Sequence, residues 1–221
     1  MQFVGVAGTA GKTAAAGLLA AILREAAFHV GFYRAGCEPL SARIAIGGVS
    51  VDPVLLCQAA EALNAAKALP REAAELAAAA RCFGAAGCKL AVVELPDAGL
   101  ASALPQMPVC AVTAIGPDGV SRSVERLAAL AAGVMRKDAV CVTAPEQPKA
   151  VLSELVVAAA KAECELVVPD AEDITFLEAE KFTSKVDYGG YTAPAGLPGP
   201  SRGGQCCRRG RAGIGPLAQG L

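Results

Sequence analysis

The chain has 221 residues, of which 54% are hydrophobic and only 4% aromatic, and its formal net charge is −1 at pH 7. This length accommodates one sizeable domain, or one domain plus a fragment, with a core of small aliphatic side chains. The near-neutral charge argues against general attraction to nucleic acid or to an anionic membrane, and no apolar run reaches the roughly 18 residues of a membrane span.

Apolar runs typical of strands alternate with helical patterns along most of the chain. The expected strands are Phe3–Ala7, Val30–Tyr33, Leu90–Leu95, Val109–Ala114, Ala139–Thr143 and Glu165–Val168. The expected helices are Lys12–Ala27, Pro53–Ala66, Arg71–Ala86, Val124–Arg136 and Lys149–Ala162. The strands are short, continuous and rich in valine, as in sheets covered on both faces. The pattern predicts an α/β fold with a mostly parallel sheet flanked by helices.

The loop between the first strand and the first helix has the layout of a phosphate-binding cradle. In Gly8-Thr9-Ala10-Gly11, small residues let backbone amides approach a polyphosphate, and the helix start adds the positive end of its dipole. Lys12 would contact the β- and γ-phosphates, and the Thr13 hydroxyl would bind Mg²⁺. In the general sequence pattern of phosphate-binding loops, a glycine occupies the position of Val6. The alternative interpretation is therefore that this segment is a glycine turn that binds no phosphate and that Lys12 is solvated.

Two hairpins are expected beside the main sheet. Ile44–Ile46 and Val49–Val51 predict a small hairpin inserted after the second strand. Phe182–Val186 and Tyr188–Thr192 predict a closing hairpin near the end of the apolar sequence.

Cysteine usage and the start of the chain indicate a cytoplasmic protein. The nine cysteines include no C-x-x-C pair, and most lie among apolar neighbours, which predicts free reduced thiols. His29 is the only histidine, so a structural zinc site is not expected. The first strand begins directly at the N-terminus, without the pattern of an export signal.

The phosphate loop resembles that of the Mur ligase superfamily, and within it the chain most resembles the folylpolyglutamate synthase/dihydrofolate synthase family. Further similar segments follow in the family's order over about the first 192 residues. They are Gly31-Phe32-Tyr33, Ala42-Arg43-Ile44, Val92-Val93-Glu94, Val112–Asp118, Val142–Pro145 and Asp187–Tyr191.

The resemblance implies an ATP-dependent carboxylate–amine ligase of folate and one-carbon metabolism, built on a Mur ligase central domain. Such enzymes phosphorylate a carboxylate with ATP, and an amine, that of glutamate in the folate enzymes, then attacks the acyl phosphate. Lys12 would be the catalytic cation, and Thr13 and Glu94 would hold Mg²⁺. The alternative for Glu94 is a solvated acid at a strand end. The implied partners are ATP, a folate, glutamate and a full-length relative.

Several family features are replaced in this sequence. Ala35–Pro39 stands where the family has a Ser-Pro-His segment, and Cys37 and Glu38 within it are candidate ligand contacts or simply a solvent loop. Leu95–Gly99 replaces a glycine-rich run. Gly119 stands where relatives have a metal-binding histidine, and Ala131 stands where they have a lysine that is often carbamylated. These replacements predict weakened acyl phosphate formation.

The end of the chain differs from the rest. We expect residues 1–192 to form the ATP-binding domain and residues 193–221, rich in Pro, Gly and Arg, to have little fixed structure. The relatives have a second α/β domain at this point, so we expect the sequence from about residue 197 to be a frameshift product or a truncated end. Three functions stay open: an impaired ligase, a non-catalytic ATP-binding module that regulates or partners a full-length relative, and another type of P-loop kinase or NTPase.

Overall fold

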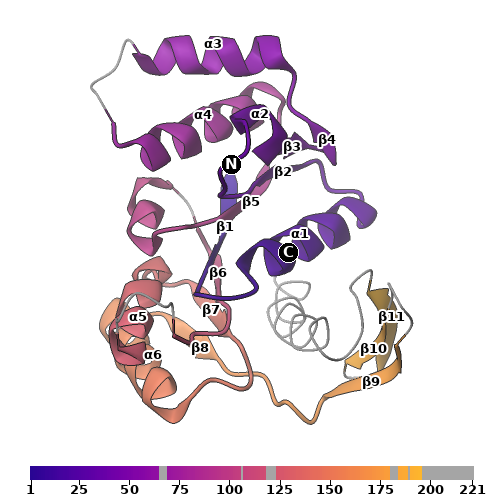
Figure 1. Cartoon of the computed structure of the whole chain (residues 1–221), viewed down its shortest axis with the longest axis vertical. Coiled ribbons are helices and arrows are strands. Elements are labelled where there is room, and N and C mark those ends of the chain that lie inside the picture. The colour runs from indigo at the N-terminus through magenta and orange to yellow at the C-terminus, as the bar shows by residue number, and fades with distance from the viewer. Residues whose placement is uncertain (65–68, 106, 118–122, 180–183, 189, 196–221) are drawn as a thin grey trace.

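The structure is a computed structural model that describes residues 1–64, 69–105, 107–117, 123–179, 184–188 and 190–195 (Figure 1). In these residues, eight strands form one sheet in the order β4-β3-β2-β5-β1-β6-β7-β8. The strands are β1 Gln2–Ala7, β2 Val30–Tyr33, β3 Ile44–Ile46, β4 Val49–Ser50, β5 Leu90–Glu94, β6 Val109–Val112, β7 Val140–Thr143 and β8 Glu165–Val167.

All neighbouring strands from β2 to β8 in this order pair in parallel, and in this sheet only the pairs β2–β3 and β3–β4 are antiparallel. The helices are α1 Lys12–Glu25, α2 Leu40–Arg43, α3 Pro53–Asn64, α4 Arg71–Ala85, α5 Val124–Ala131 and α6 Lys149–Ala162. Short 3₁₀ helices cover Ala98–Ala103 (η1) and Ala132–Val134 (η2). The predicted fold class, a P-loop sheet with a hairpin insertion, is therefore confirmed.

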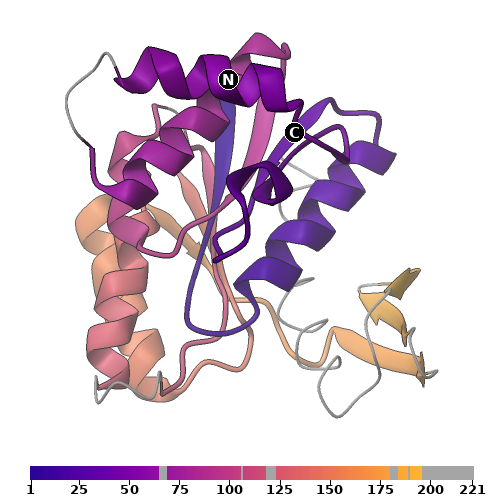
Figure 2. The same ribbon diagram turned by 45° about the horizontal axis from the view of Figure 1, so that its top comes forward.

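Alternation along β1 sends its side chains into two separate cores. Val4 and Val6 pack under α1 with Leu19 and Leu23 of that helix. Phe3 points to the opposite face, where Figure 2 shows α4, α5 and α6. Both faces of β1 are thus covered, which explains why this strand has no polar residue between Phe3 and Ala7.

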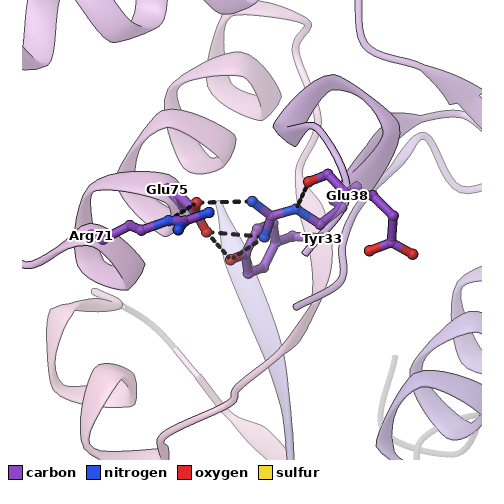
Figure 3. A network of polar contacts seen from close by, with 5 residues as sticks. Tyr33, Glu38, Arg71 and Glu75 are labelled. Atoms are coloured by element: carbon purple, nitrogen blue, oxygen red, sulfur yellow. Dashed lines mark hydrogen bonds and ion pairs between the residues drawn. The ribbon is translucent and has the colours of Figure 1, made fainter. Parts of the chain in front are cut away.

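A buried ion pair joins the hairpin corner to α4 (Figure 3). The Arg43 side chain is only 2% exposed, and its two terminal nitrogens each lie 2.9 Å from one oxygen of Glu75. Arg43 also donates to the backbone oxygen of Glu38, while Arg71 donates to Glu75 from the solvent side. The hydrogen bonds from Arg43 hold the pKa of Glu75 below its usual value. This pair fixes the corner between β2 and β3.

The end of the described chain forms a separate three-stranded antiparallel sheet in the order β11-β10-β9 (Figure 1). Its strands are β9 Ile174–Ala179, β10 Ser184–Tyr188 and β11 Tyr191–Ala195. The closing hairpin is present, with its turn at Gly190, where φ is +84°. Residues 193–195, expected to begin the tail, belong to β11, where they pair with β10. The expected strand residues Phe182 and Thr183 and the tail from residue 196 onward lie outside the described residues.

The main difference from the sequence-based expectations concerns the helix after β6. It ends as an α-helix at Ala131, five residues earlier than expected, and continues as η2 around Gly133. Glycine in a helix interior weakens it, which explains the change to a short 3₁₀ turn. Most other ends agree within two residues. Among the described helices, none is long and apolar enough to cross a membrane.

Candidate functional site

The strand order places the site at the carboxyl end of β1. From β1 the chain passes through α1 to β2 on one side, whereas β5 is followed by β6 on the other side of β1. The order of the strands therefore reverses around β1, and the carboxyl ends of β5, β1 and β6 lie next to one another. Ligands of open α/β sheets bind at such a point.

The loop that leaves β1 keeps the front of α1 open. Gly8 has φ +130° and Gly11, which precedes the first helical residue, has φ +83°. Such angles suit glycine, which lacks the Cβ that would clash. In the described chain, no side chain caps the N-terminus of α1. The amide groups at the front of this helix are therefore available to an anion.

The segment after β6 holds this loop in place. Thr9 Oγ1 donates to the backbone oxygen of Ala114 over 3.1 Å and accepts from the amide of Gly116 over 2.9 Å. The amides of Thr9 and Ala10 also donate to Ala114 O. The loop is thus attached to the neighbouring strand end by both backbone and side chain, a preformed arrangement for binding a ligand.

Lys12 curls back over the loop that precedes it. Its Nζ donates to the backbone oxygen of Gly8 over 2.9 Å, so the ammonium group lies on the concave side of the cradle. A lysine in this place supplies a compact positive charge to a bound polyphosphate.

Thr13 and Glu94 meet beside the cradle. The Thr13 hydroxyl lies 3.0 Å from each carboxylate oxygen of Glu94, whose side chain at the end of β5 is 4% exposed. Glu94 is therefore not the solvated acid of the alternative interpretation. A hydroxyl and a carboxylate are hard oxygen donors, the type that Mg²⁺ prefers. Within the described ranges, no group of three or more His, Cys, Asp or Glu residues is arranged for a metal, so an ion here would complete its shell with water and phosphate oxygens.

A cavity of about 560 Å³ opens between the loop and α5. Its walls come from the end of β1 and the phosphate loop, the segment after β5, and one face of α5. They are Ala7, Gly8, Thr9, Lys12, Leu95, Pro96, Asp97, Ala98, Arg126, Leu127, Leu130 and Ala131. The cavity thus borders the phosphate loop at Gly8, Thr9 and Lys12.

The other predicted site residues differ in whether they reach this cavity. Ala131 lines the cavity, so its position does face the site. Cys37 is exposed and Glu38 pairs with Arg34 over 2.8 Å, and neither lines the cavity. Gly119, like Asp118, lies outside the described residues.

Sequence reasoning missed two contributors to the site. Arg126 lines the cavity, and no sequence pattern distinguishes it from other arginines on helix surfaces. Gln147 donates to Thr113 O and accepts from the amide of Ile115, which braces the segment that holds the loop. No local pattern indicated this role, because Gln147 and Thr113 are 34 residues apart in the sequence.

No protein-family model matches the chain, and no curated protein matches it in sequence. Solved structures do match. A folylpolyglutamate synthase from Thermotoga maritima aligns with 100% of this chain and 54% of its own, with a TM-score of 0.83 and 18% identity. The Mycobacterium tuberculosis folylpolyglutamate synthase complexed with ADP gives 0.80 and 18% over 99% of this chain and 54% of its own.

A bifunctional folylpolyglutamate synthase/dihydrofolate synthase with Mn, AMPPNP and L-glutamate bound gives a TM-score of 0.74 and 21% identity over 96% of this chain and 53% of its own. The chain spans about half the length of these structures. The resemblance seen in the sequence is therefore confirmed at the level of the fold: the chain folds as does the matching half of the folylpolyglutamate synthase and dihydrofolate synthase structures.

Proposed function

We propose that this chain binds ATP with Mg²⁺ at the front of α1 and is the nucleotide-binding part, residues 1–192, of a cytoplasmic ATP-dependent carboxylate–amine ligase. The observation that carries the proposal is the contact of Thr13 with Glu94 beside the glycine loop and Lys12. Amides, a cation and two oxygen donors for a metal converge there at the carboxyl end of β1. The ADP and the Mn with AMPPNP in the matched structures support the same ligand class.

Each residue has a distinct task in the proposed reaction. The amides at the front of α1 and Lys12 would bind the β- and γ-phosphates, and Thr13 and Glu94 would hold the ion, whose charge would stabilise the transferred phosphoryl group. A carboxylate oxygen of the acid substrate attacks the γ-phosphorus, and the bond to the β,γ-bridging oxygen breaks with its electrons leaving on ADP. The amine of glutamate then attacks the acyl carbon, the bond from this carbon to the phosphate oxygen breaks with its electrons leaving on phosphate, and the nitrogen loses a proton to solvent. The acid would be a folate or a related carboxylate.

A second function is favoured by the chemistry at Ala131. This methyl side chain lines the cavity and cannot bind a metal or a proton, although its position corresponds to a functional lysine in the family that the sequence resembles. A non-catalytic ATP-binding module, acting on or with a full-length relative, would keep the cradle and dispense with such a lysine.

An assay of ADP release separates the two functions. The protein is incubated with ATP, Mg²⁺, glutamate and either dihydropteroate or tetrahydrofolate, with Lys12→Ala as the control variant. Substrate-dependent ADP release that is lost in Lys12→Ala supports the ligase. Nucleotide binding without turnover supports the module. Folded protein that neither binds nor hydrolyses ATP contradicts both.

A further inference from the structure

The segment that holds the phosphate loop is itself held from a second side. Toward the loop, the Ala114 oxygen and the Gly116 amide both bind the Thr9 hydroxyl. On its other side the segment contacts Gln147, which lies between β7 and α6 and is half-buried. Gln147 is not among the residues that line the cavity. A side chain outside the loop, outside β6 and outside the cavity therefore contributes to the position of the loop.

The side-chain amide of Gln147 fits its surroundings in one orientation. Its nitrogen Nε2 donates to the backbone oxygen of Thr113 and to Thr143 Oγ1, each over 3.0 Å. Its oxygen Oε1 accepts from the backbone amide of Ile115 over 3.1 Å. If the two atoms were exchanged, an oxygen would face the Thr113 oxygen and an NH₂ group would face the Ile115 amide. Thr113, Thr143 and Ile115 are at most 2% exposed, so water would replace these contacts poorly.

These contacts fix the backbone on both sides of Ala114. Gln147 binds the residue before Ala114 and the residue after it. The Ala114 oxygen accepts from Thr9 Oγ1 and from the amides of Thr9 and Ala10, over 3.1 to 3.2 Å. A displacement of Ala114 would therefore change three hydrogen bonds of the loop together. Lys12 and the front of α1 follow this anchored stretch directly, so their placement depends on it.

We propose that Gln147 is a positioning residue of the nucleotide site: through the segment after β6 and the Thr9 hydroxyl, it holds the phosphate loop in the conformation that binds a polyphosphate. This inference rests on the proposed nucleotide site. A loop that is already ordered loses less conformational freedom when its ligand binds, so the ligand binds more tightly. If the loop leaves this conformation for part of the time, the apparent affinity falls in proportion to the competent fraction.

Nucleotide binding tests this role in a double-mutant cycle. AMPPCP with Mg²⁺ is titrated calorimetrically into the wild type, Gln147→Met, Thr9→Val and the double variant. Methionine is close to glutamine in length but has neither its donor nor its acceptor, and valine removes the Thr9 hydroxyl with little change of shape. Gln58→Met, at an exposed glutamine of α3, is the matched control.

Gln147→Met should weaken AMPPCP binding roughly 5- to 20-fold, because two buried backbone groups lose their partner and the loop loses its anchor. In the Thr9→Val background, where the side-chain link between segment and loop is absent, the same substitution should weaken binding less than about threefold. A role in overall stability alone would give equal factors in both backgrounds. Gln58→Met should leave the affinity unchanged. Gln147→Glu, which replaces the donor by a carboxylate oxygen, is a second variant and should also weaken binding.

Amide hydrogen exchange of the nucleotide-free protein gives an independent readout. The amides of Thr9, Ala10 and Gly116 should exchange roughly 5- to 20-fold faster in Gln147→Met than in the wild type. Equal exchange at these amides in the two folded proteins overturns the inference, and so do equal AMPPCP affinities or equal factors in the two Thr9 backgrounds. If the wild type binds no AMPPCP, the nucleotide proposal fails, whereas faster exchange in Gln147→Met still supports the positioning of the loop by Gln147.

Discussion

Replacing Gly8 by alanine should damage both the fold and the cradle. A Cβ at this position would lie 2.3 Å from Thr113 Oγ1 and 3.0 and 3.1 Å from the backbone oxygen and nitrogen of Thr113. The Thr113 hydroxyl cannot turn away without cost, because it is buried and donates to Ala7 O over 3.1 Å. The φ of +130° adds backbone strain for any residue with a Cβ.

Strain at such an angle costs about 1–3 kcal/mol, and overpacking in a tight core costs about 1–3 kcal/mol. Gly8→Ala should therefore lower the free energy of unfolding by about 2–6 kcal/mol. Urea unfolding followed by far-ultraviolet circular dichroism is the suitable measurement, since the chain contains no tryptophan.

Gly17→Ala in α1 is the matched control. A Cβ at Gly17 would meet nothing within 4 Å, so the same substitution should stabilise the helix by about 0.5–1 kcal/mol. ATP affinity should be lost in Gly8→Ala and kept in Gly17→Ala. If Gly8→Ala unfolds within 1 kcal/mol of the wild type and binds ATP equally well, the close approach of the loop to β6 is wrong.

Other substitutions test the site and the ion pair separately. Lys12→Ala should weaken ATP binding by about 1.5–3 kcal/mol in calorimetry, as expected for a lost charge-assisted hydrogen bond, and an unchanged affinity contradicts the role of this lysine. Glu94→Gln should weaken Mn²⁺ binding to the nucleotide complex about tenfold in electron paramagnetic resonance titrations, while equal binding places the ion elsewhere. Glu75→Ala leaves Arg43 buried without its partner and should cost about 3–5 kcal/mol of unfolding free energy, whereas Arg71→Ala, at the exposed end, should cost less than about 1 kcal/mol. Hydrogen bonding to Arg43 lowers the pKa of Glu75 from its usual 4.5. The pair therefore stabilises the folded protein above pH 4.5, and this stabilisation is lost as the pH falls below that value and the carboxylate becomes protonated. If the acid unfolding curves of the wild type and of Glu75→Ala have the same shape, this assignment is wrong.

The sequence predicted the central sheet and its helices because their signals are local. Val-rich runs bounded by glycine and proline mark the strands, and Ser123 marks the start of α5, where its hydroxyl accepts from the amide of Arg126. The cradle was predictable for the same reason, since glycines, Lys12 and Thr13 are adjacent in the chain. The contact of Thr13 with Glu94 joins residues 81 apart and was anticipated only through the family resemblance.

Elements that depend on tertiary contacts were not predicted. Helix α2 has only four residues, too few for a periodic pattern, and its Arg43 is placed by Glu75 on a different helix. Strand β9, although mostly apolar, lies outside the expected strands and is defined by its pairing with β10. The cavity arises where the phosphate loop, the segment after β5 and α5 converge, which no single window of the sequence contains. Cys57 has apolar neighbours in the sequence but is exposed on α3, because neighbours in the chain do not fix which side of a helix is buried.

Equilibrium dialysis with radiolabelled ATP tests the central claim most directly. Folded wild-type protein with Mg²⁺ should take up one nucleotide per chain, with lower uptake when the metal is chelated and in Lys12→Ala. If folded protein retains no labelled ATP at millimolar nucleotide and Mg²⁺, the front of α1 is not a nucleotide site, and only the shared fold would connect this chain with the ligases.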